Sequence, residues 1–212
     1  MKGHVVYGLH RFFDTSCTYV TLVRHPVRRV LSLFYFLRRS WPDSEIGRMT
    51  LGEFLDRSPD AYTPNDQVCR IAGYAPDRQG PATEETLEQA KKNVDEHFAV
   101  CGLTERFDES LLLMKRRLGW SKPPFYVRSN TNAQRPRAAE VDDALIDRIR
   151  ADHSLDLRLH AHVADQLETA IEDDDGFERD LRRFRTMNGV VQPLLSGPLR
   201  LFRAGRRTLL AR

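Results

Sequence analysis

The pattern of apolar and polar positions predicts a buried strand followed at once by an amphipathic helix. Residues 19–23 form an unbroken apolar, β-branched run, which is typical of a buried strand. After it, apolar residues recur at the spacing of a helix, as at Val27, Val30 and Phe34, so one face of this helix is expected to pack on a sheet. Pro26 suits the first helical turn, where its missing N–H costs nothing.

The same alternation returns further along the chain. Residues 83–97 read as an amphipathic helix capped by Thr83, residues 98–103 as a second buried strand, and residues 104–114 as the start of another helix. Apolar strands that alternate with helices indicate a parallel sheet covered on both faces. A capping-box pattern from Thr50 predicts a short helix, and two more helices are expected, at 141–150 and at 154–172 with Ser154 as its cap.

Charge adds one feature to this picture. The chain has 212 residues and a net charge of only +3, but arginines gather around the first strand–helix junction, at positions 24, 28, 29, 38 and 39. A basic cluster at that place fits an anionic ligand, and the alternative is a set of solvated helix faces. The length predicts one domain with a substantial core.

The cysteines and the absence of membrane signals bear on the compartment. Cys17, Cys69 and Cys101 are widely spaced, odd in number and without a CxxC pair, which favours a reducing compartment over a disulfide framework or a metal site. No apolar run reaches transmembrane length, and no signal-peptide pattern opens the sequence. We therefore expect a cytoplasmic protein that uses no metal.

The junction itself is a candidate anion site. A strand that delivers Arg24 to a helix N-terminus brings a guanidinium, backbone donors and the positive end of the helix dipole to one point. Ser32 lies on the second turn of the helix, where its hydroxyl could reach the same anion. The alternative is an ordinary strand–turn–helix whose arginine pairs with a surface carboxylate.

Two segments resemble sulfotransferases. Residues 24–36, Arg-His-Pro-Val-Arg-Arg-Val-Leu-Ser-Leu-Phe-Tyr-Phe, resemble the 3′-phosphate-binding motif, in the form found in heparan sulfate 2-O-sulfotransferase and its bacterial relatives. Residues 102–110, Gly-Leu-Thr-Glu-Arg-Phe-Asp-Glu-Ser, are the second most specific match. The resemblance implies a P-loop-NTPase-like, three-layer α/β fold with a parallel sheet, and it assigns Arg24 and Ser32 to the 3′-phosphate of 3′-phosphoadenosine-5′-phosphosulfate. The family has Asp where this chain has His25, which leaves those phosphate contacts possible.

The resemblance also implies roles for other residues. His4 falls on the position of the family's catalytic base, and imidazole titrates near the pH at which an acceptor hydroxyl must lose its proton. His10 is expected to be structural. A polar loop that bears Arg128, Asn130 and Thr131 corresponds to the loop that closes on the donor nucleotide. The segment 65–73 resembles one that lies near the acceptor site.

One part of the family's site is missing from the sequence. No Gly-rich, Lys-bearing loop of the kind that grips the 5′-phosphosulfate is present, either as GxxxxGK[ST] or as Pro-Lys-x-Gly. We therefore expect a domain that is incomplete at its N-terminus, with Met1 as an internal start, or else a natural fragment without that half of the site.

The expected organisation is a sulfotransferase-type domain at 1–173, followed by a charged helix and a basic amphipathic tail at 174–212. The expected function is transfer of a sulfuryl group from 3′-phosphoadenosine-5′-phosphosulfate to a hydroxyl, with a carbohydrate as the preferred acceptor. One alternative is an inactive, truncated remnant that only binds the nucleotide. Another is an interaction protein whose tail contacts a membrane surface; nucleic acid is disfavoured because the tail lacks interleaved aromatic and basic residues.

Overall fold

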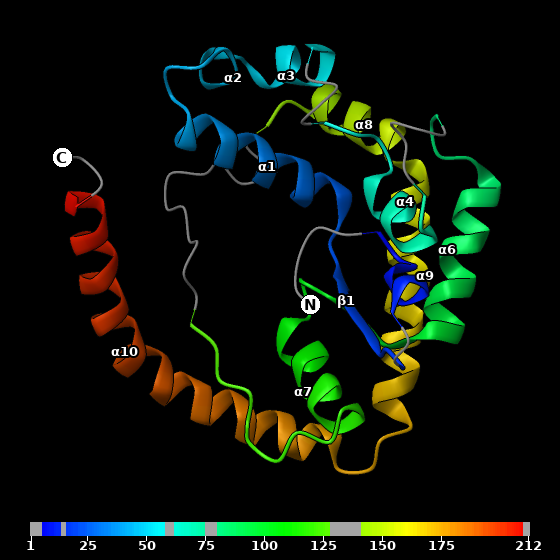
Figure 1. Cartoon of the computed structure of the whole chain (residues 1–212), viewed down its shortest axis with the longest axis vertical. Helices are drawn as coiled ribbons and strands as arrows, with labels where there is room; N and C mark the ends of the chain where they lie inside the picture. The colour runs from blue at the N-terminus through cyan, green and yellow to red at the C-terminus, as the bar shows by residue number, and fades with distance from the viewer. Residues whose placement is uncertain (1–5, 14–15, 58–61, 75–79, 128–140, 210–212) are drawn as a thin grey trace.

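A computed structural model of the chain describes residues 6–13, 16–57, 62–74, 80–127 and 141–209, with side chains described up to residue 194. The elements run in the order drawn in Figure 1. They are η1 (Leu9–Phe12), β1 (Tyr19–Val23), α1 (Pro26–Ser40), α2 (Glu45–Arg48), α3 (Leu51–Arg57), α4 (Asp66–Ala72), α6 (Glu84–His97), β2 (Phe98–Leu103), α7 (Phe107–Arg117), α8 (Asp143–Asp152), α9 (Ser154–Glu172) and α10 (Phe177–Leu209).

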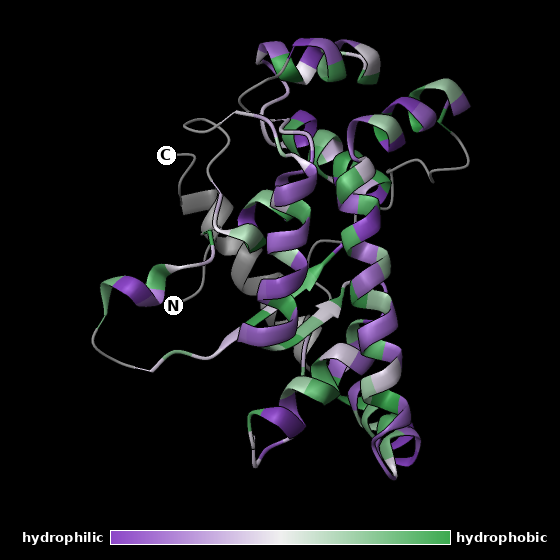
Figure 2. Ribbon diagram, turned by 90° about the vertical axis from the view of Figure 1, so that its right-hand side faces the viewer, coloured by the Kyte–Doolittle hydropathy of each residue, from purple (hydrophilic) through white to green (hydrophobic). Residues whose placement is uncertain are grey.

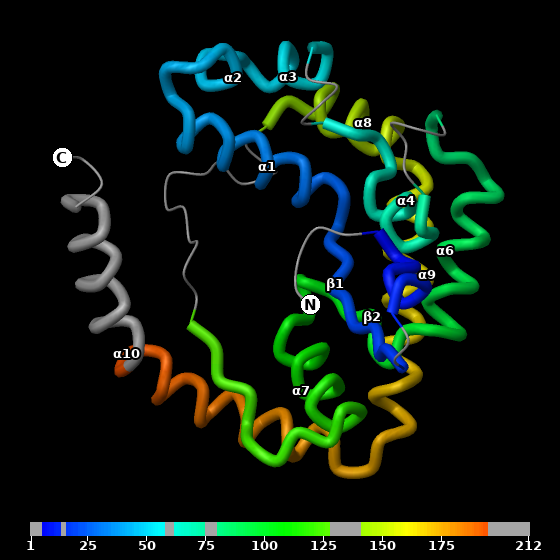
Figure 3. The backbone as a smooth tube through the Cα atoms, viewed as in Figure 1, coloured from blue at the N-terminus to red at the C-terminus, as the bar shows by residue number. Residues whose placement is uncertain are grey.

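The two predicted strands pair in parallel and form the described sheet. The register joins Val20 to Val100 and Val23 to Leu103, with an irregularity after Tyr19. Figure 3 shows β1 and β2 side by side between α7 and α9. The coarse prediction of a mixed α/β structure with a parallel sheet is therefore confirmed.

Helices pack on β2 and supply most of the core. In β1 only Val23 is buried, so the prediction of a buried strand at 19–23 is wrong for the first four residues, which line a cavity. α7 and α9 pack on β2, while α4 packs on α6 and α9. Gly102 is needed where α7 crosses β2, because a Cβ there would lie 2.4 Å from the Cβ of Ser110. A second apolar cluster joins the buried face of α1 to α3 and α8. In Figure 2 hydrophilic and hydrophobic bands alternate along the helices, as their sequence periodicity predicts.

Helix α9 has the predicted bounds but not the predicted cap. The residue at its N-cap is His153, and Ser154 is the first helical residue. The free N–H groups of Leu155 and Asp156 are instead bound by the side-chain oxygen of Asn65, each at 3.0 Å. The cap of α9 is therefore the side chain of Asn65, which precedes α4 and is distant in sequence.

Helix α10 is longer than predicted. The sequence indicated a charged helix at 176–187 and an irregular tail, whereas one helix runs over Phe177–Leu209. Phe177, Leu181 and Phe184 are buried at helical spacing in the same core cluster as the sheet. Among the helices of the described ranges, none is long and apolar enough to cross a bilayer.

Candidate functional site

The predicted strand–helix junction is present. β1 ends at Val23, and after Arg24 and His25 the chain enters α1 with Pro26 in the first turn. The first helical hydrogen bond, from the Arg29 N–H to the His25 carbonyl, is 2.9 Å long. The backbone donors of the first turn of α1 therefore lie directly beside the carboxyl end of a parallel strand, where α/β proteins commonly bind ligands.

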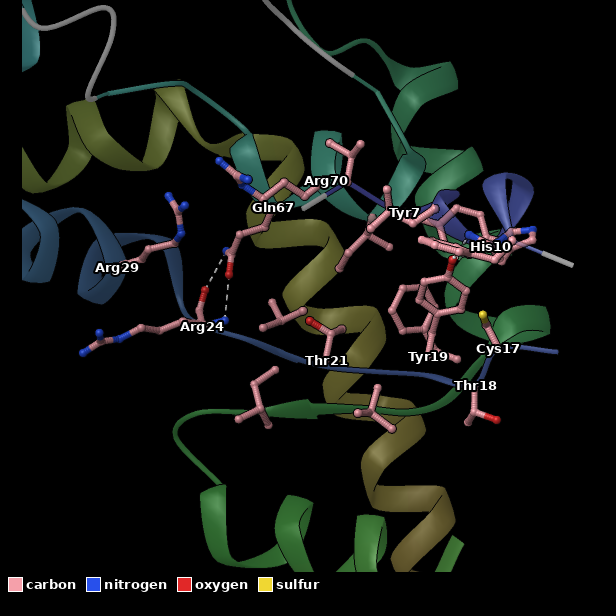
Figure 4. Close-up of a pocket in the computed structure, with 18 residues that line it drawn as sticks. Tyr7, His10, Cys17, Thr18, Tyr19, Thr21, Arg24, Arg29, Gln67 and Arg70 are labelled. Carbon is pink, nitrogen blue, oxygen red and sulfur yellow. Dashed lines mark hydrogen bonds between the residues drawn. The ribbon is translucent and has the colours of Figure 1, made fainter. Parts of the chain in front are cut away.

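A side-chain amide fixes the backbone of Arg24. The Arg24 N–H donates to Gln67 Oε1 at 2.8 Å, and Gln67 Nε2 donates to the Arg24 carbonyl at 2.8 Å (Figure 4). Val23 turns its carbonyl to β2, where it accepts from Thr104 N at 2.9 Å. Because successive residues of a strand direct their backbone groups to opposite edges, those of Arg24 point away from β2. Gln67 thus forms the two hydrogen bonds that a residue of a neighbouring strand would otherwise form with the backbone of Arg24.

Glu105, which follows β2, fixes the backbone of His25. Its Oε1 accepts the His25 N–H at 3.1 Å, and its Oε2 lies 3.6 Å from Nε2 of His160. Burial opposes ionisation of Glu105, but the His160 imidazole and the His25 N–H outweigh it and lower its pKa to about 2. Burial and the neighbouring His160 lower the pKa of His25, so its imidazole stays neutral where an ordinary histidine begins to charge.

The six predicted site residues divide into two groups. Arg24 lies at the junction, where it lines a cavity, and Ser32 is half-buried in α1. Arg28 is one helical turn before Ser32, so the two share a face of α1. The other four, His4, Arg128, Asn130 and Thr131, lie outside the described residues. The assignments of all six residues remain predictions.

The cavity runs along β1 and has a volume of about 740 Å³ (Figure 4). Every residue from Thr18 to Arg24 lines it, and at one end it is bounded by Arg29, Gln67 and Arg70. Aromatic rings from the N-terminal segment and the strand line the other end. They are Tyr7, His10, Phe13, Tyr19 and Phe98. Its volume is in the range of pockets that bind small molecules.

The aromatic end is tightly interconnected. His10 Nδ1 lies 2.8 Å from the Tyr19 hydroxyl, which also accepts the His10 N–H at 2.9 Å. The Tyr7 ring lies 4.9 Å from the Tyr19 ring and stacks on His97 with an interplanar angle of 13°. Burial, followed by the neighbouring Tyr19, raises the pKa of Tyr7.

The sequence did not reveal the part played by residues 65–73. Gln67 fixes Arg24, and Asp66 forms ion pairs with Arg29 and Arg70. α4 is itself held by α9, since the buried Asp156 accepts the Val68 N–H at 2.8 Å. The only signal available in the sequence was the run of polar residues at the start of this helix, and it did not identify their partners.

Comparisons with known proteins place this site in context. A family model described as galactose-3-O-sulfotransferase matches residues 4–195. Galactose-3-O-sulfotransferase 3 of Bos taurus is 29% identical over 165 residues, covering 73% of this chain and 38% of the relative. Galactosylceramide sulfotransferase of Bos taurus is 33% identical over 161 residues, or 69% of this chain and 37% of the relative. Heparin sulfate O-sulfotransferase of Drosophila melanogaster is 30% identical over 135 residues, which is 56% of this chain and 39% of the relative.

These findings test two expectations. The resemblance to sulfotransferases is confirmed, while the finer assignment to 2-O enzymes and their bacterial relatives stays a prediction. The expectation of a cytoplasmic protein is wrong, because the matched relatives are sulfotransferases of the Golgi type. The chain spans about 38% of the length of the galactose-3-O relative from cattle.

Proposed function

The chain belongs to the galactose-3-O-sulfotransferase family, and from that premise we propose that it serves sulfuryl transfer from 3′-phosphoadenosine-5′-phosphosulfate to a hydroxyl of a carbohydrate or glycolipid. The relatives, which include galactose and galactosylceramide sulfotransferases, support an acceptor that carries galactose. The P-loop-NTPase-like, three-layer architecture is part of the same proposal.

One observation carries the donor side of this proposal. The backbone of Arg24 is held by Gln67 through two hydrogen bonds of 2.8 Å, and the adjoining His25 is held by Glu105. Both contacts fix the direction in which β1 delivers Arg24 to the N-terminus of α1. We assign Arg24 and Ser32 to the donor's 3′-phosphate, for which a guanidinium and a hydroxyl beside a helix N-terminus are suitable partners.

The chemical step requires a base and stabilisation of charge. We assign the base to His4, which would take the proton of the acceptor hydroxyl as its oxygen attacks sulfur. The S–O bond to the nucleotide breaks as the new one forms, and the 5′-phosphate leaves with the electron pair. Arg128, Asn130 and Thr131 are proposed to bind the donor nucleotide. Positioned donors act on the transferring group, and the rate advantage comes from alignment and from electrostatic stabilisation.

A ligand-dependent thermal shift tests the donor site. We expect 3′-phosphoadenosine 5′-phosphate to raise the melting temperature of the parent chain; at a hundredfold excess over Kd, binding adds about 2.7 kcal/mol of stability. Arg24→Ala should lose this response. Arg39→Ala is the matched control, because Arg39 is an exposed arginine near the other end of α1.

The outcomes separate binding from catalysis. A folded parent without any response, or an equal loss in the Arg39 control, contradicts the donor site at Arg24. A second assay follows transfer of labelled sulfuryl groups to lactose and to galactosylceramide. Binding without transfer to either acceptor would favour a module that holds the nucleotide but does not catalyse.

A further inference from the structure

A pair of arginines on the cavity wall shares one buried carboxylate. Arg70 Nε lies 2.9 Å from Asp66 Oδ2, and Arg29 forms an ion pair with the same oxygen. The Asp66 side chain is only 10% exposed, while those of Arg29 and Arg70 are 28% and 38% exposed. Asp66 therefore binds both guanidiniums, and Arg29 and Arg70 both line the cavity.

The charges of this group do not cancel. Two guanidiniums against one carboxylate leave one positive charge, which a single carboxylate or sulfate group would balance. Each guanidinium has five N–H donors, and Asp66 engages one of each in the bonds described. The carboxylate of Asp156 does not compete for them, because it accepts the Val68 N–H at the start of α4 and lies buried against α9.

The basic pair is joined rigidly to the aromatic end of the cavity. The Tyr7 N–H donates to the Arg70 carbonyl at 2.7 Å. Tyr7 also lies close to Gly73, where a Cβ would come within 2.9 Å of the Tyr7 carbonyl oxygen. Gly73 has a φ of +80°, which favours glycine, so the close approach of the two segments depends on this residue.

Arg24 is directed elsewhere. In Figure 4 its side chain leads away from β1 on the side opposite to Gln67 and Arg70, and that of Arg29 points back toward Gln67. A phosphate held by Arg24 and Ser32 would therefore leave the Arg29–Asp66–Arg70 group available to a second anion. This separation favours a group of the acceptor, and not the donor's 3′-phosphate, as the anion bound by Arg29 and Arg70.

We propose that the Arg29–Asp66–Arg70 group binds the acidic substituent, carboxylate or sulfate, of a saccharide whose sugar ring lies against Tyr7 and Tyr19. The inference rests on the proposed function and names its acceptor class as an acidic glycan. Guanidinium N–H groups match the planar spacing of carboxylate and sulfate oxygens, and tyrosines offer an apolar ring together with a polar hydroxyl to a sugar.

Calorimetric titration with matched disaccharides tests the proposal. The probes are lactose, lactose that carries one sulfate on the galactose 6-hydroxyl, and inorganic sulfate. The parent should bind the sulfated disaccharide at least tenfold more tightly than either of the other two. Arg70→Gln should remove this preference, and Arg70→Lys, which keeps the charge but not the planar donors, should weaken it at least fivefold. Arg39→Gln, the exposed control on α1, should leave it unchanged.

Several results would overturn the proposal. These are equal affinity for lactose and its sulfated form, equal affinity for inorganic sulfate, or the same loss in the Arg39 control. If Arg70→Gln fails to fold, a full preference in Arg70→Lys is sufficient to reject it. Titration of the same samples with 3′-phosphoadenosine 5′-phosphate separates the two hypotheses, since binding of the nucleotide without the saccharide preference rejects only this one.

Discussion

Replacing Gln67 with methionine tests how the Arg24 backbone is held. Methionine has a similar length and no hydrogen-bonding amide, so Gln67→Met removes both 2.8 Å bonds without opening a large cavity. The Gln67 residue is only 8% exposed, so an apolar group would face the N–H and the carbonyl of Arg24. These two groups would then depend on water from the cavity.

The magnitude follows from the number of groups left unpaired. Each unsatisfied buried donor or acceptor costs about 1–3 kcal/mol. Arg24 is half-buried beside the cavity, which places both groups at the lower end of that range. We expect Gln67→Met to lower the free energy of unfolding by about 2 kcal/mol, or roughly 4–8 °C in melting temperature for a chain of this size. It should also weaken binding of 3′-phosphoadenosine 5′-phosphate.

Urea unfolding followed by circular dichroism at 222 nm measures the effect. Gln166→Met is the control, because the Gln166 amide donates to the surface carboxylate of Asp95. The free energy of unfolding of this variant should differ from that of the parent by less than about 0.5 kcal/mol. Gln67→Glu adds a sharper comparison, since an ionised carboxylate cannot donate to the Arg24 carbonyl whereas a protonated one can. A Gln67→Met protein as stable as the parent would refute the reasoning.

Three further predictions concern other parts of the molecule. The fold favours the ionised form of Glu105, so this residue contributes to stability above pH 4.5 and the contribution is lost as the pH falls from 4.5 to about 2. Glu105→Gln should flatten the acid-unfolding profile in this range, and an unchanged profile would contradict the assignment. Gly102→Ala should destabilise the fold by about 3 kcal/mol in the same urea assay, because the new Cβ would lie 2.4 Å from the Cβ of Ser110. Cys17 is exposed, whereas burial raises the pKa of Cys101 to about 12, so a thiol reagent should modify Cys17 far faster in the native protein; equal rates would count against the burial.

The strand–helix junction could be predicted because its signals are local. A short apolar run, a proline at the first helical position and helical spacing after it are enough to fix β1 and α1. The amide that holds Arg24 comes from Gln67, 43 positions later in the sequence. The pattern within one segment does not show which distant residue it contacts. The sequence therefore predicts residues 65–73 to lie near the acceptor, but it does not predict the hydrogen bonds between Gln67 and Arg24.

Two errors about helices have a related cause. Ser154 has the residue type of an N-cap, but Asn65 binds the free N–H groups of α9 from 90 positions away. The tail contains Gly189 and Pro193, which argue against a long helix, yet α10 continues past both. Packing of Phe177, Leu181 and Phe184 against the core fixes the start of α10, and that tertiary contact was not visible in the sequence.

The second edge of β1 has a consequence for how the chain behaves in solution. Leu22 and Val20 direct their backbone groups to the same side as Arg24, and β2 is the only strand paired with β1 in the described part of the chain. β1 contains neither proline nor a charged residue, the usual protection of such an edge against pairing with another molecule. Gln67 covers this edge at Arg24, so we expect chains at high concentration to associate by adding strand to strand along the rest of it, at Val20 and Leu22. A preparation used for binding measurements should therefore be kept dilute and checked by light scattering.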